Sequence, residues 1–294
     1  MATILITGAS GQLGNEIRVA SQNYYGYDFI FTDTDTLDIT DREKTKEFIT
    51  DARPGWIVNC AAYNAVDKAE TEYEKALLVN GTAVGYLTEA IKGSECRLIH
   101  ISSDYVFSGD SSVPYTENDL PQPLTAYGKT KLEGEKNALK HHGSMVIRTS
   151  WLYSSFGHNF VKTILRNAST KDLLRVVYDQ TGTPTYAADL AESIMIIIAG
   201  VIRNQVAFNT GIYHYSNEGV CSWFDFASEI IHESGLACKI EPILSKEFTA
   251  SAKRPWYTVM DKSRIKENYN ITIPHWRTSL KRCIRIINQT KQIC

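Results

Sequence analysis

The sequence predicts an α/β fold: a doubly wound parallel sheet with helices on both faces, followed by a smaller, mixed C-terminal part. Three observations support this prediction. Apolar strand-like runs alternate with helix-like segments through the first 150 residues, an order typical of chains that build a parallel sheet. Three spaced glycines, Gly8, Gly11 and Gly14, separate the first run from the first helix. After about Trp151 the alternation becomes irregular.

The first half of the chain alternates strand and helix signals throughout. Strands are expected at residues 3–7, 28–32, 56–60, 97–101 and 145–149, and helices at 12–22, 41–52, 72–92 and 126–141. Asp41 suits the N-cap of the second helix, and Pro54 lies beyond its end. This βαβα order favours a parallel sheet that is buried on both faces.

The three glycines predict a dinucleotide-binding corner of the Rossmann type. Gly8 allows a tight turn, Gly11 lets the backbone approach a pyrophosphate, and Gly14 lets the helix pack closely on the strand. The N-terminus of the helix then faces the negative charge. The GxxGxxG spacing points to the short-chain dehydrogenase branch, although glycines at such intervals also occur in ordinary turns.

The second half of the chain gives fewer signals. Helices are expected at residues 160–168, 188–202 and 279–287, another is capped by Ser222 and runs to about Ser234, and a strand is expected at 212–215. We therefore expect an NAD(P)-binding Rossmann domain at residues 1–150, to which later segments return. Residues 151–294 would form a mainly substrate-binding, interleaved part over the C-terminal edge of the sheet, where open α/β sheets bind ligands.

Composition argues against several kinds of partner. The net charge of −2 gives no electrostatic reason to expect nucleic acid or an anionic membrane. The six cysteines are scattered without a CxxC pair, so reduced thiols are expected rather than a disulfide scaffold. The apolar run at 194–202 is too short to span a bilayer. Since the first strand begins almost at the N-terminus, we expect no signal peptide and a cytoplasmic protein.

Asp33 follows the second expected strand, about 20 residues after the glycines. A carboxylate at this position accepts hydrogen bonds from the adenosine ribose and repels a 2′-phosphate. The glycine loop contains no basic residue, and Arg42 is the first one after Asp33, which favours NADH over NADPH. The alternative is that Asp33 is a turn residue in a polar segment.

Tyr127 and Lys131 form a Tyr-x-x-x-Lys pair at the start of an expected helix. Residues four apart share one helix face, so both side chains can point to one spot. A tyrosine with its free pKa of about 10 is a poor acid or base at neutral pH. A nearby ammonium group lowers that pKa and brings proton transfer into range, and the same lysine can hold the nicotinamide ribose.

Ser103 and Asp104 directly follow the fourth expected strand. A hydroxyl at this edge can bind a carbonyl oxygen as it becomes an alkoxide, although a serine at a strand end is commonly a turn former or a helix cap. Asn80, inside an expected helix, also has two interpretations. It either supports the backbone near the site or is exposed on the surface.

This ordered set of glycine loop, strand-two acid, strand-four serine and Tyr-x-x-x-Lys resembles the short-chain dehydrogenase/reductase superfamily. The length and the irregular C-terminal part resemble its extended branch, which acts mostly on nucleotide sugars. Four segments resemble the dTDP-4-dehydrorhamnose reductase family: residues 57–70 (IVNCAAYNAVDKAE), 102–107 (SSDYVF), 148–151 (RTSW) and 179–185 (DQTGTPT). The resemblance runs from Thr3 to about Trp276.

The resemblance implies a reaction. That family reduces the 4-keto group of dTDP-4-dehydro-6-deoxy-L-mannose to give dTDP-L-rhamnose, which is used for cell-surface polysaccharide, with hydride from NADPH or NADH. It implies that Tyr127 protonates the sugar O4 and that Lys131 lowers the tyrosine pKa and binds the ribose. Ser103, where relatives often have threonine, would hydrogen-bond the developing alkoxide.

The resemblance also implies contacts to both ligands. Cofactor contacts are implied for Gly8, Gly11, Gln12, Leu13, Gly14, Asp33, Asp38, Ile39, Ala61, Ala62, Tyr63, Tyr127 and Lys131. Substrate contacts are implied for Ser103, Asp104, Trp151, Asn159, Gln180 and Arg254. A guanidinium suits a diphosphate, and the alternative for Arg254 is a solvated surface charge.

Several points rest on the resemblance alone. Some relatives carry a lysine where this chain has Ala9, which fits the use of NADH or of both NADH and NADPH. Some bind magnesium at a subunit contact, but we assign no metal ligand here, and a homodimer is implied in the same way. Two other interpretations stay open: a nucleotide-sugar epimerase or dehydratase of the same superfamily, and a non-catalytic subunit resembling the regulatory β subunit of methionine adenosyltransferase.

Overall fold

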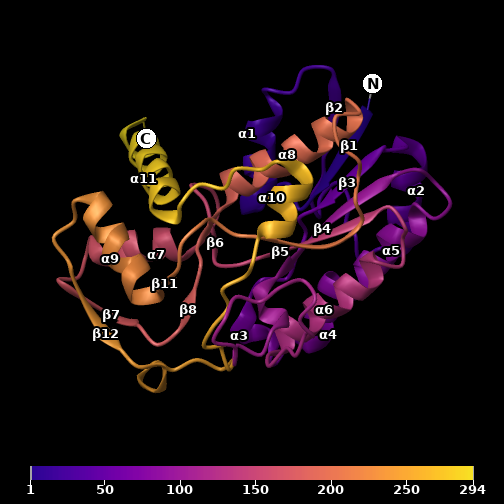
Figure 1. Cartoon of the computed structure of the whole chain (residues 1–294). Coiled ribbons are helices and arrows are strands. Elements are labelled where there is room, and N and C mark those ends of the chain that lie inside the picture. The colour runs from indigo at the N-terminus through magenta and orange to yellow at the C-terminus, as the bar shows by residue number, and fades with distance from the viewer. Residues whose placement is uncertain (1, 294) are drawn as a thin grey trace.

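A six-stranded parallel sheet forms the larger half of the molecule (Figure 1), seen in a computed structural model that describes residues 2–293. Its strands are β1 (Ala2–Thr7), β2 (Tyr27–Phe31), β3 (Trp56–Asn59), β4 (Arg97–Ser103), β5 (Ser144–Thr149) and β10 (Gly211–Tyr215), in the order β10-β5-β4-β3-β1-β2. In register, Ile6 of β1 lies between Phe31 of β2 and Val58 of β3. Strand β2 is therefore added on one side of β1, and β3 and the later strands on the other. This reversal of strand order opens a crevice at the C-terminal ends of the strands.

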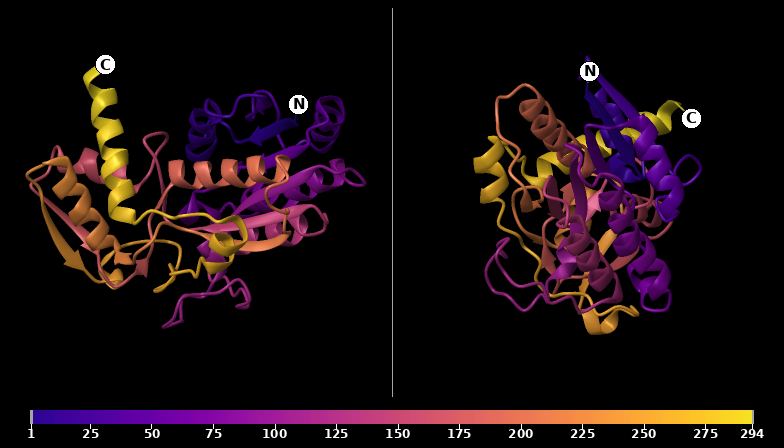
Figure 2. Two further views of the ribbon diagram at one scale, coloured as in Figure 1. Left: turned by 45° about the horizontal axis from the view of Figure 1, so that its top comes forward. Right: turned by 90° about the vertical axis from the view of Figure 1, so that its right-hand side faces the viewer.

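Helices cover both faces of this sheet because its strands are apolar on both sides. Ile4 and Ile6 pack on one face with α1 (Gln12–Ser21), α8 (Ala187–Ile202) and α10 (Ser263–Tyr269). Leu5 faces the other side, against α2 (Arg42–Ala52), α5 (Ala83–Ala90) and α6 (Ala126–Ala138). Figure 2 shows α8 lying along the sheet. The predicted doubly wound α/β fold is confirmed.

A π-helical turn interrupts the region where the sequence predicted one helix at residues 72–92. The chain forms α3 (Val66–Ala69), α4 (Tyr73–Leu77), the π turn η1 (Leu78–Thr82) and then α5. The turn carries Asn80 inward, where it is fully buried. The Asn80 carboxamide accepts a hydrogen bond from the Tyr63 N–H at 2.9 Å and donates to the Tyr63 carbonyl at 3.1 Å. Asn80 thus supports the backbone beside the crevice and is not a surface residue.

The smaller half has a core of its own. Its short strand pairs are β6 (Leu152–Tyr153) with β9 (Thr185–Tyr186), β7 (Leu173–Val177) with β12 (Lys239–Ile243), and β8 (Thr181–Gly182) with β11 (Cys221–Ser222). The helices α7 (Phe160–Ala168), α9 (Trp223–Ser234) and α11 (Trp276–Ile293) enclose a core that includes Tyr153, Phe226 and Trp276. The packing of this core stabilises strand pairs that are too short to be stable on their own.

The predicted helix at residues 160–168 has the observed bounds of α7, and α9 follows the predicted cap, Ser222. There the Ser222 hydroxyl accepts from the Asp225 N–H, and the Asp225 carboxylate accepts from the Ser222 N–H. Other boundaries differ. Helix α6 ends at Ala138 rather than 141, and α11 extends well beyond the predicted 279–287 at both ends. The short strand pairs and α10 were not predicted, because runs of two to seven residues carry little periodicity.

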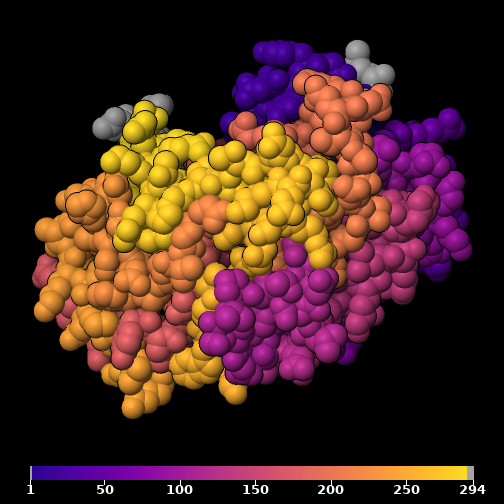
Figure 3. Space-filling view, in the orientation of Figure 1, coloured from indigo at the N-terminus to yellow at the C-terminus, as the bar shows by residue number. Residues whose placement is uncertain are grey.

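The chain crosses between the two halves more than once. After β9, helix α8 and strand β10 return to the sheet. In Figure 3 the C-terminal segments (yellow) run across one face from the sheet half toward the smaller half. A division into residues 1–150 and 151–294 therefore remains a proposal about function.

The described cysteines are free thiols, and four of them are buried: Cys96, Cys221, Cys238 and Cys283. Cys60 is half-buried at the end of β3. Within residues 2–293, no helix is both long enough and apolar enough to cross a membrane.

Candidate active site

A cavity of about 490 Å³ lies where the C-terminal ends of the strands meet the smaller half. Twelve of the residues singled out from the sequence line it: Gly8, Gly11, Gln12, Leu13, Ala62, Ser103, Asp104, Tyr127, Lys131, Trp151, Asn159 and Arg254. They come from sequence positions as distant as 8 and 254, so the fold gathers them. Asn64, Ser102, Phe160 and Trp223 line the same cavity and were not among the predicted site residues.

Seven predicted residues do not line the cavity: Gly14, Asp33, Asp38, Ile39, Ala61, Tyr63 and Gln180. The Ile39 side chain is buried in the core beneath one face of the sheet. The Tyr63 hydroxyl donates to Glu72 at 3.0 Å. The Gln180 carboxamide donates to the Ser245 hydroxyl at 2.9 Å.

The glycine loop packs closely against neighbouring backbone and leaves the start of α1 uncapped. Gly8 has φ +63°, and a Cβ placed on it would lie 2.6 Å from the Ala61 N and Cα atoms. A Cβ on Gly14 would lie 2.5 Å from the Ala9 Cα, so no side chain larger than hydrogen fits. Gly11 is the N-cap of α1 and offers no side-chain cap. The first N–H groups of α1 are thus available to an anion, which fits a pyrophosphate.

Asp33 holds this loop to the end of β2. Its carboxylate accepts hydrogen bonds from the Ser10 N–H and the Thr34 N–H, each at 2.8 Å. Burial on its own would raise the pKa of Asp33, but these hydrogen bonds outweigh it and hold the pKa below its usual value. Asp33 therefore remains an anion at neutral pH, next to the loop that it stabilises.

Helix α6 presents Tyr127 and Lys131 to the end of β4. The Thr125 hydroxyl caps the helix by accepting from the Gly128 N–H at 3.0 Å. The Lys131 ammonium donates to the Ile101 carbonyl at 2.6 Å, and the Tyr127 hydroxyl donates to the Asn64 carboxamide oxygen at 3.5 Å.

Burial shifts the pKa values of both side chains. It raises the pKa of the Tyr127 phenol, opposed by the nearby Ser103 hydroxyl and reinforced by Asp104. It lowers the pKa of Lys131 to about 8, against the effect of Glu135 and Cys60. The site thus holds a phenol that keeps its proton and an ammonium close to its titration range.

Ser103 and Asp104 form a buried pair at the end of β4. The Ser103 hydroxyl donates to Asp104 Oδ1 at 2.9 Å and accepts from the Tyr105 N–H at 3.2 Å. Asp104 is 1% exposed, and its Oδ2 has no hydrogen-bond partner among the described residues. Burial raises the pKa of Asp104 to about 6. An oxygen of this kind suits a hydroxyl donor from a ligand.

The smaller half forms the opposite wall from aromatic rings and one guanidinium. Trp151 has a left-handed backbone, φ 45°, and its ring stacks on Trp223 with centroids 3.6 Å apart. Phe160 lies against Trp223, with centroids 4.6 Å apart. The Arg254 guanidinium donates to Asp67 at 2.9 Å, and its Nε is buried without a hydrogen-bond partner among the described residues.

The residues missed by the sequence reasoning differ in the signal they gave. Asn64 lies within the segment at 57–70 that carries the family resemblance, so the sequence could have named it as a site residue beside Tyr127. No sequence signal pointed to Trp223. Its ring reaches Trp151 only because α9 packs against the residues that follow β5.

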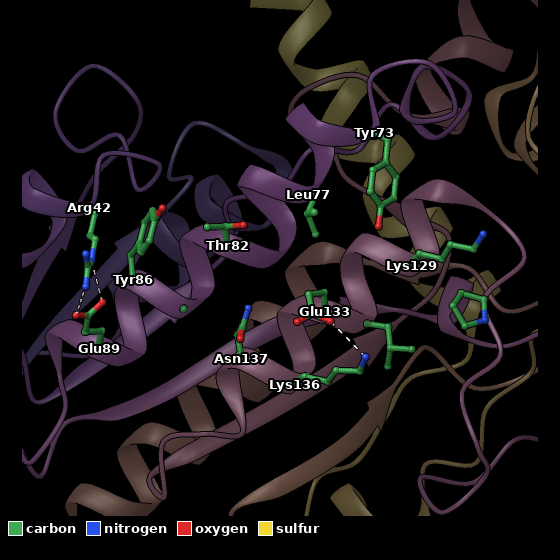
Figure 4. Close-up of a pocket in the computed structure, with 13 residues that line it drawn as sticks. Arg42, Tyr73, Leu77, Thr82, Tyr86, Glu89, Lys129, Glu133, Lys136 and Asn137 are labelled. Carbon is green, nitrogen blue, oxygen red and sulfur yellow. Dashed lines mark hydrogen bonds and ion pairs between the residues drawn. The ribbon is translucent and has the colours of Figure 1, made fainter.

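A larger hollow of about 750 Å³ lies elsewhere, between α4, α5 and α6 (Figure 4). Its rim carries the exposed ion pairs Arg42–Glu89 and Lys136–Glu133. None of the predicted site residues lines it. Size therefore does not single out the candidate site, and we base the choice on Ser103, Tyr127 and Lys131, which line the smaller cavity together.

Across the described residues, no group of three or more His, Cys, Asp or Glu side chains is placed to hold a metal ion. The magnesium suggested by the resemblance thus finds no support in this part of the chain.

Known proteins resemble this chain over nearly its whole length. The family model described as the RmlD substrate binding domain matches residues 1–289. The chain is 39% identical to a spore coat polysaccharide biosynthesis protein, SpsK, of Bacillus subtilis, covering 96% of each. It is 39% identical to a dTDP-4-dehydrorhamnose reductase of Aggregatibacter actinomycetemcomitans, covering 96% of this chain and 98% of the other. A Bacillus anthracis dTDP-4-dehydrorhamnose reductase, solved in complex with NADP, has a TM-score of 0.89 at 36% identity, covering 97% of this chain and all of the other.

Proposed function

The chain belongs to the RmlD family of dTDP-4-dehydrorhamnose reductases, and from that membership we propose how its residues perform the reaction. The enzyme is an NAD(P)H-dependent oxidoreductase of dTDP-rhamnose biosynthesis, a route to cell-surface polysaccharide. It reduces the 4-keto group of dTDP-4-dehydro-6-deoxy-L-mannose to give dTDP-L-rhamnose. The observation that carries the assignment of roles is the meeting of Ser103, Tyr127 and Lys131 in the cavity that the glycine loop enters.

The glycine loop fits a nicotinamide dinucleotide. The close approach of Gly8 to Ala61 and the uncapped N-terminus of α1 support a pyrophosphate site formed by Gly11, Gln12 and Leu13. When bound, NAD(P)H supplies the hydride that reaches the sugar C4. Further cofactor contacts are proposed for Asp33, Asp38 and Ile39 at the adenosine end and for Ala61, Ala62 and Tyr63 after β3.

The chain's own task is to give a proton to the sugar O4 as it gains charge. Tyr127 is the proposed donor, since burial keeps its phenol protonated at neutral pH. The Lys131 ammonium lies on the same helix face, and its charge eases loss of the phenolic proton and holds the nicotinamide ribose. The Ser103 hydroxyl turns from Asp104 toward O4 and donates a second hydrogen bond there.

The opposite wall is proposed to bind the rest of the substrate. Asp104 Oδ2, unpaired among the described residues, accepts a hydrogen bond from a sugar hydroxyl. The ring of Trp151 covers the apolar side of the sugar. The Arg254 guanidinium exchanges Asp67 for the diphosphate. Asn159 and Gln180 are assigned to the diphosphate and deoxythymidine ends.

Three further points are proposals. Asp33 and Ala9 favour NADH, and the NADP held by the similar Bacillus anthracis structure favours NADPH, so we propose that the enzyme uses both. We propose a cytoplasmic location. We also propose a homodimer, which sedimentation of the purified chain would test.

The test is oxidation of NADH and NADPH, followed by the absorbance of the reduced nicotinamide after adding the keto sugar nucleotide. Steady oxidation by the wild type is expected with both cofactors, and its near-complete loss is expected in Tyr127→Phe. An epimerase or dehydratase would consume no added cofactor, and a regulatory subunit would bind it without turnover. Either result would overturn the proposed function.

A further inference from the structure

A buried ion pair lies directly behind the proposed catalytic helix. Glu135 in α6 is 1% exposed, and so is Arg148 in β5. The Glu135 carboxylate accepts from Arg148 Nε at 2.9 Å and from Arg148 Nη2 at 2.7 Å. Neither residue lines the cavity, so the pair takes no part in ligand contact.

The same carboxylate reaches the end of β4. Glu135 Oε1 also accepts from the Ser102 hydroxyl at 2.5 Å. Ser102 precedes Ser103 and is the register partner of Arg148 across the β4–β5 ladder. One carboxylate therefore ties together three elements: the helix that carries Tyr127 and Lys131, the strand end that carries Ser103, and the strand beside it.

Glu135 also lies on the same helix face as the two proposed catalytic groups. It follows Lys131 by four residues and Tyr127 by eight, so all three share one stripe of α6. The charged or titratable groups that act on Lys131 from neighbouring elements are the Cys60 thiol after β3 and the His100 imidazole in β4. Burial, and next to it Lys131, hold the pKa of His100 well below its usual value. Glu135 is thus the anionic neighbour of Lys131 in this set.

An ion pair this deep is costly to bury and is weak evidence for stability. Well-packed apolar residues of similar volume often serve the fold equally well. The guanidinium Nη1 of Arg148 even lacks a hydrogen-bond partner among the described residues, and the group stacks over Phe107 at 5.0 Å. A role in placing the catalytic groups explains why a charged pair occupies this position.

We infer that Glu135 is a positioning residue of the reductase: through Arg148 and Ser102 it fixes α6, with Tyr127 and Lys131, against the end of β4. This inference rests on the proposed roles of Tyr127, Lys131 and Ser103. Misplacement of reacting groups by about 1 Å can cost about 10²-fold in rate. Loss of the carboxylate charge lowers the pKa of Lys131, so the ammonium is lost at lower pH.

The main test compares Glu135→Gln with Glu133→Gln. Glu133 lies on the outer face of the same helix, where Figure 4 shows it paired with Lys136. We expect Glu135→Gln to lower kcat by about 10- to 100-fold. The alkaline limb of the kcat/KM profile should move about 1 pH unit lower. Glu133→Gln should match the wild type in both.

A second variant separates positioning from simple packing. Glu135→Leu combined with Arg148→Met removes both charges and leaves no unpaired guanidinium, so it should fold. We expect this folded variant to bind NADPH yet to show the lowered kcat. Its alkaline limb should lie near that of the wild type, because an anion and the adjacent cation are removed together. A folded double variant with wild-type kcat would overturn the inference.

Ser102→Ala serves if the Glu135 variants do not fold, because it deletes only the hydroxyl that binds Glu135. Since Ser102 also lines the cavity, KM and NADPH affinity are measured with kcat, and positioning requires that both stay at the wild-type value. We expect a fall in kcat of about 3-fold or more for this variant, and an unchanged kcat would count against the inference. The two proposals fail in different ways. If wild-type enzyme oxidises neither cofactor, the proposed function fails. If it does and the Glu135 variants match it, only this inference fails.

Discussion

The two walls of the cavity are built in different ways. On the sheet side, the proposed site residues lie on regular elements: Gly11 at the start of α1, Ser103 at the end of β4, and Tyr127 and Lys131 on one face of α6. On the other side, Trp151 has a left-handed backbone and Arg254 extends from an irregular segment. Backbone hydrogen bonds place the first wall, and side-chain packing places the second.

This difference suggests a division of labour. A wall fixed by the backbone can hold reacting atoms within the small tolerance that catalysis needs. A wall fixed by rings and one guanidinium can adapt to a large nucleotide sugar. Changes on the sheet side should therefore lower kcat or stability, and changes on the other side should raise KM.

The largest effect is expected for Tyr127→Phe. Removal of the phenolic hydroxyl takes away the proposed proton donor and should lower kcat by about 10²- to 10⁴-fold. The ring, which contacts Tyr105 edge to face, stays in place, so NADPH affinity should change little. Stopped-flow turnover and a fluorescence titration with NADPH would measure the two quantities. Comparable losses of kcat and cofactor affinity would place Tyr127 in binding instead.

Gly14→Ala should give the next largest effect. The added Cβ would lie 2.5 Å from the Ala9 Cα, so α1 must move off the loop, with a loss of stability of up to about 3 kcal/mol and weaker NADPH binding. Gly55→Ala is the matched control, because its Cβ would lie 3.8 Å from the Thr3 carbonyl oxygen. Urea unfolding of both variants measures the difference. Equal stability would mean that the corner is less tightly packed than the structure indicates.

Asp104→Asn should change how stability depends on pH. In the folded protein burial raises the pKa of Asp104 to about 6 from 3.8, so the folded state binds the proton more tightly than the unfolded state. This group's contribution to stability is therefore present below pH 4 and is lost as pH rises through 6.

The neutral, isosteric Asp104→Asn has no such loss. Its free energy of unfolding should exceed that of the wild type by on the order of 3 kcal/mol well above pH 6, and the difference should shrink toward pH 4. Denaturant curves at several pH values measure it. A difference that is the same at pH 4 and pH 7 would show that Asp104 does not titrate in this range. Activity should fall in the variant, because a proposed substrate contact is changed.

The smallest effect is expected on the other wall. Arg254→Gln should raise KM for the sugar nucleotide by about 10-fold, the loss of one charge-assisted contact, with kcat nearly unchanged. Asp67→Asn is the paired variant, since it removes the other half of the Arg254 contact and should lower KM or leave it unchanged. A fall in kcat for Arg254→Gln without a change in KM would contradict the division between the two walls.

The sequence was sufficient for the sheet side because its signals are local. The glycine spacing, the apolar runs and the Tyr-x-x-x-Lys pair each lie within one element or turn. The roles of Asp33 and Asn80 needed the fold. The Asp33 carboxylate accepts from the Ser10 N–H, 23 residues away in the chain. Asn80 points inward because it lies in a π turn, which no hydrophobic periodicity predicts.

The other wall could be predicted only in part. Trp151 and Arg254 were named through resemblance, but Trp223 was missed, since its contact depends on how α9 packs. Gln180 was also named through resemblance; it donates to Ser245 and does not line the cavity, so its substrate contact stays a prediction. The strands of this half are too short to carry a pattern, and their pairing is decided by the shared core around Phe226.

The buried free thiols can report local unfolding of the molecule. Cys96 lies beneath the sheet and Cys283 lies in α11 within the second core. Burial raises the pKa of both thiols, so an alkylating reagent can modify either one only when the surrounding structure opens. Peptide mass spectrometry after timed alkylation would therefore report, residue by residue, which half loosens first, without any label being introduced. If bound cofactor slows the alkylation of Cys96 more than that of Cys283, the cofactor stabilises chiefly the half that contains the six-stranded sheet and the glycine loop.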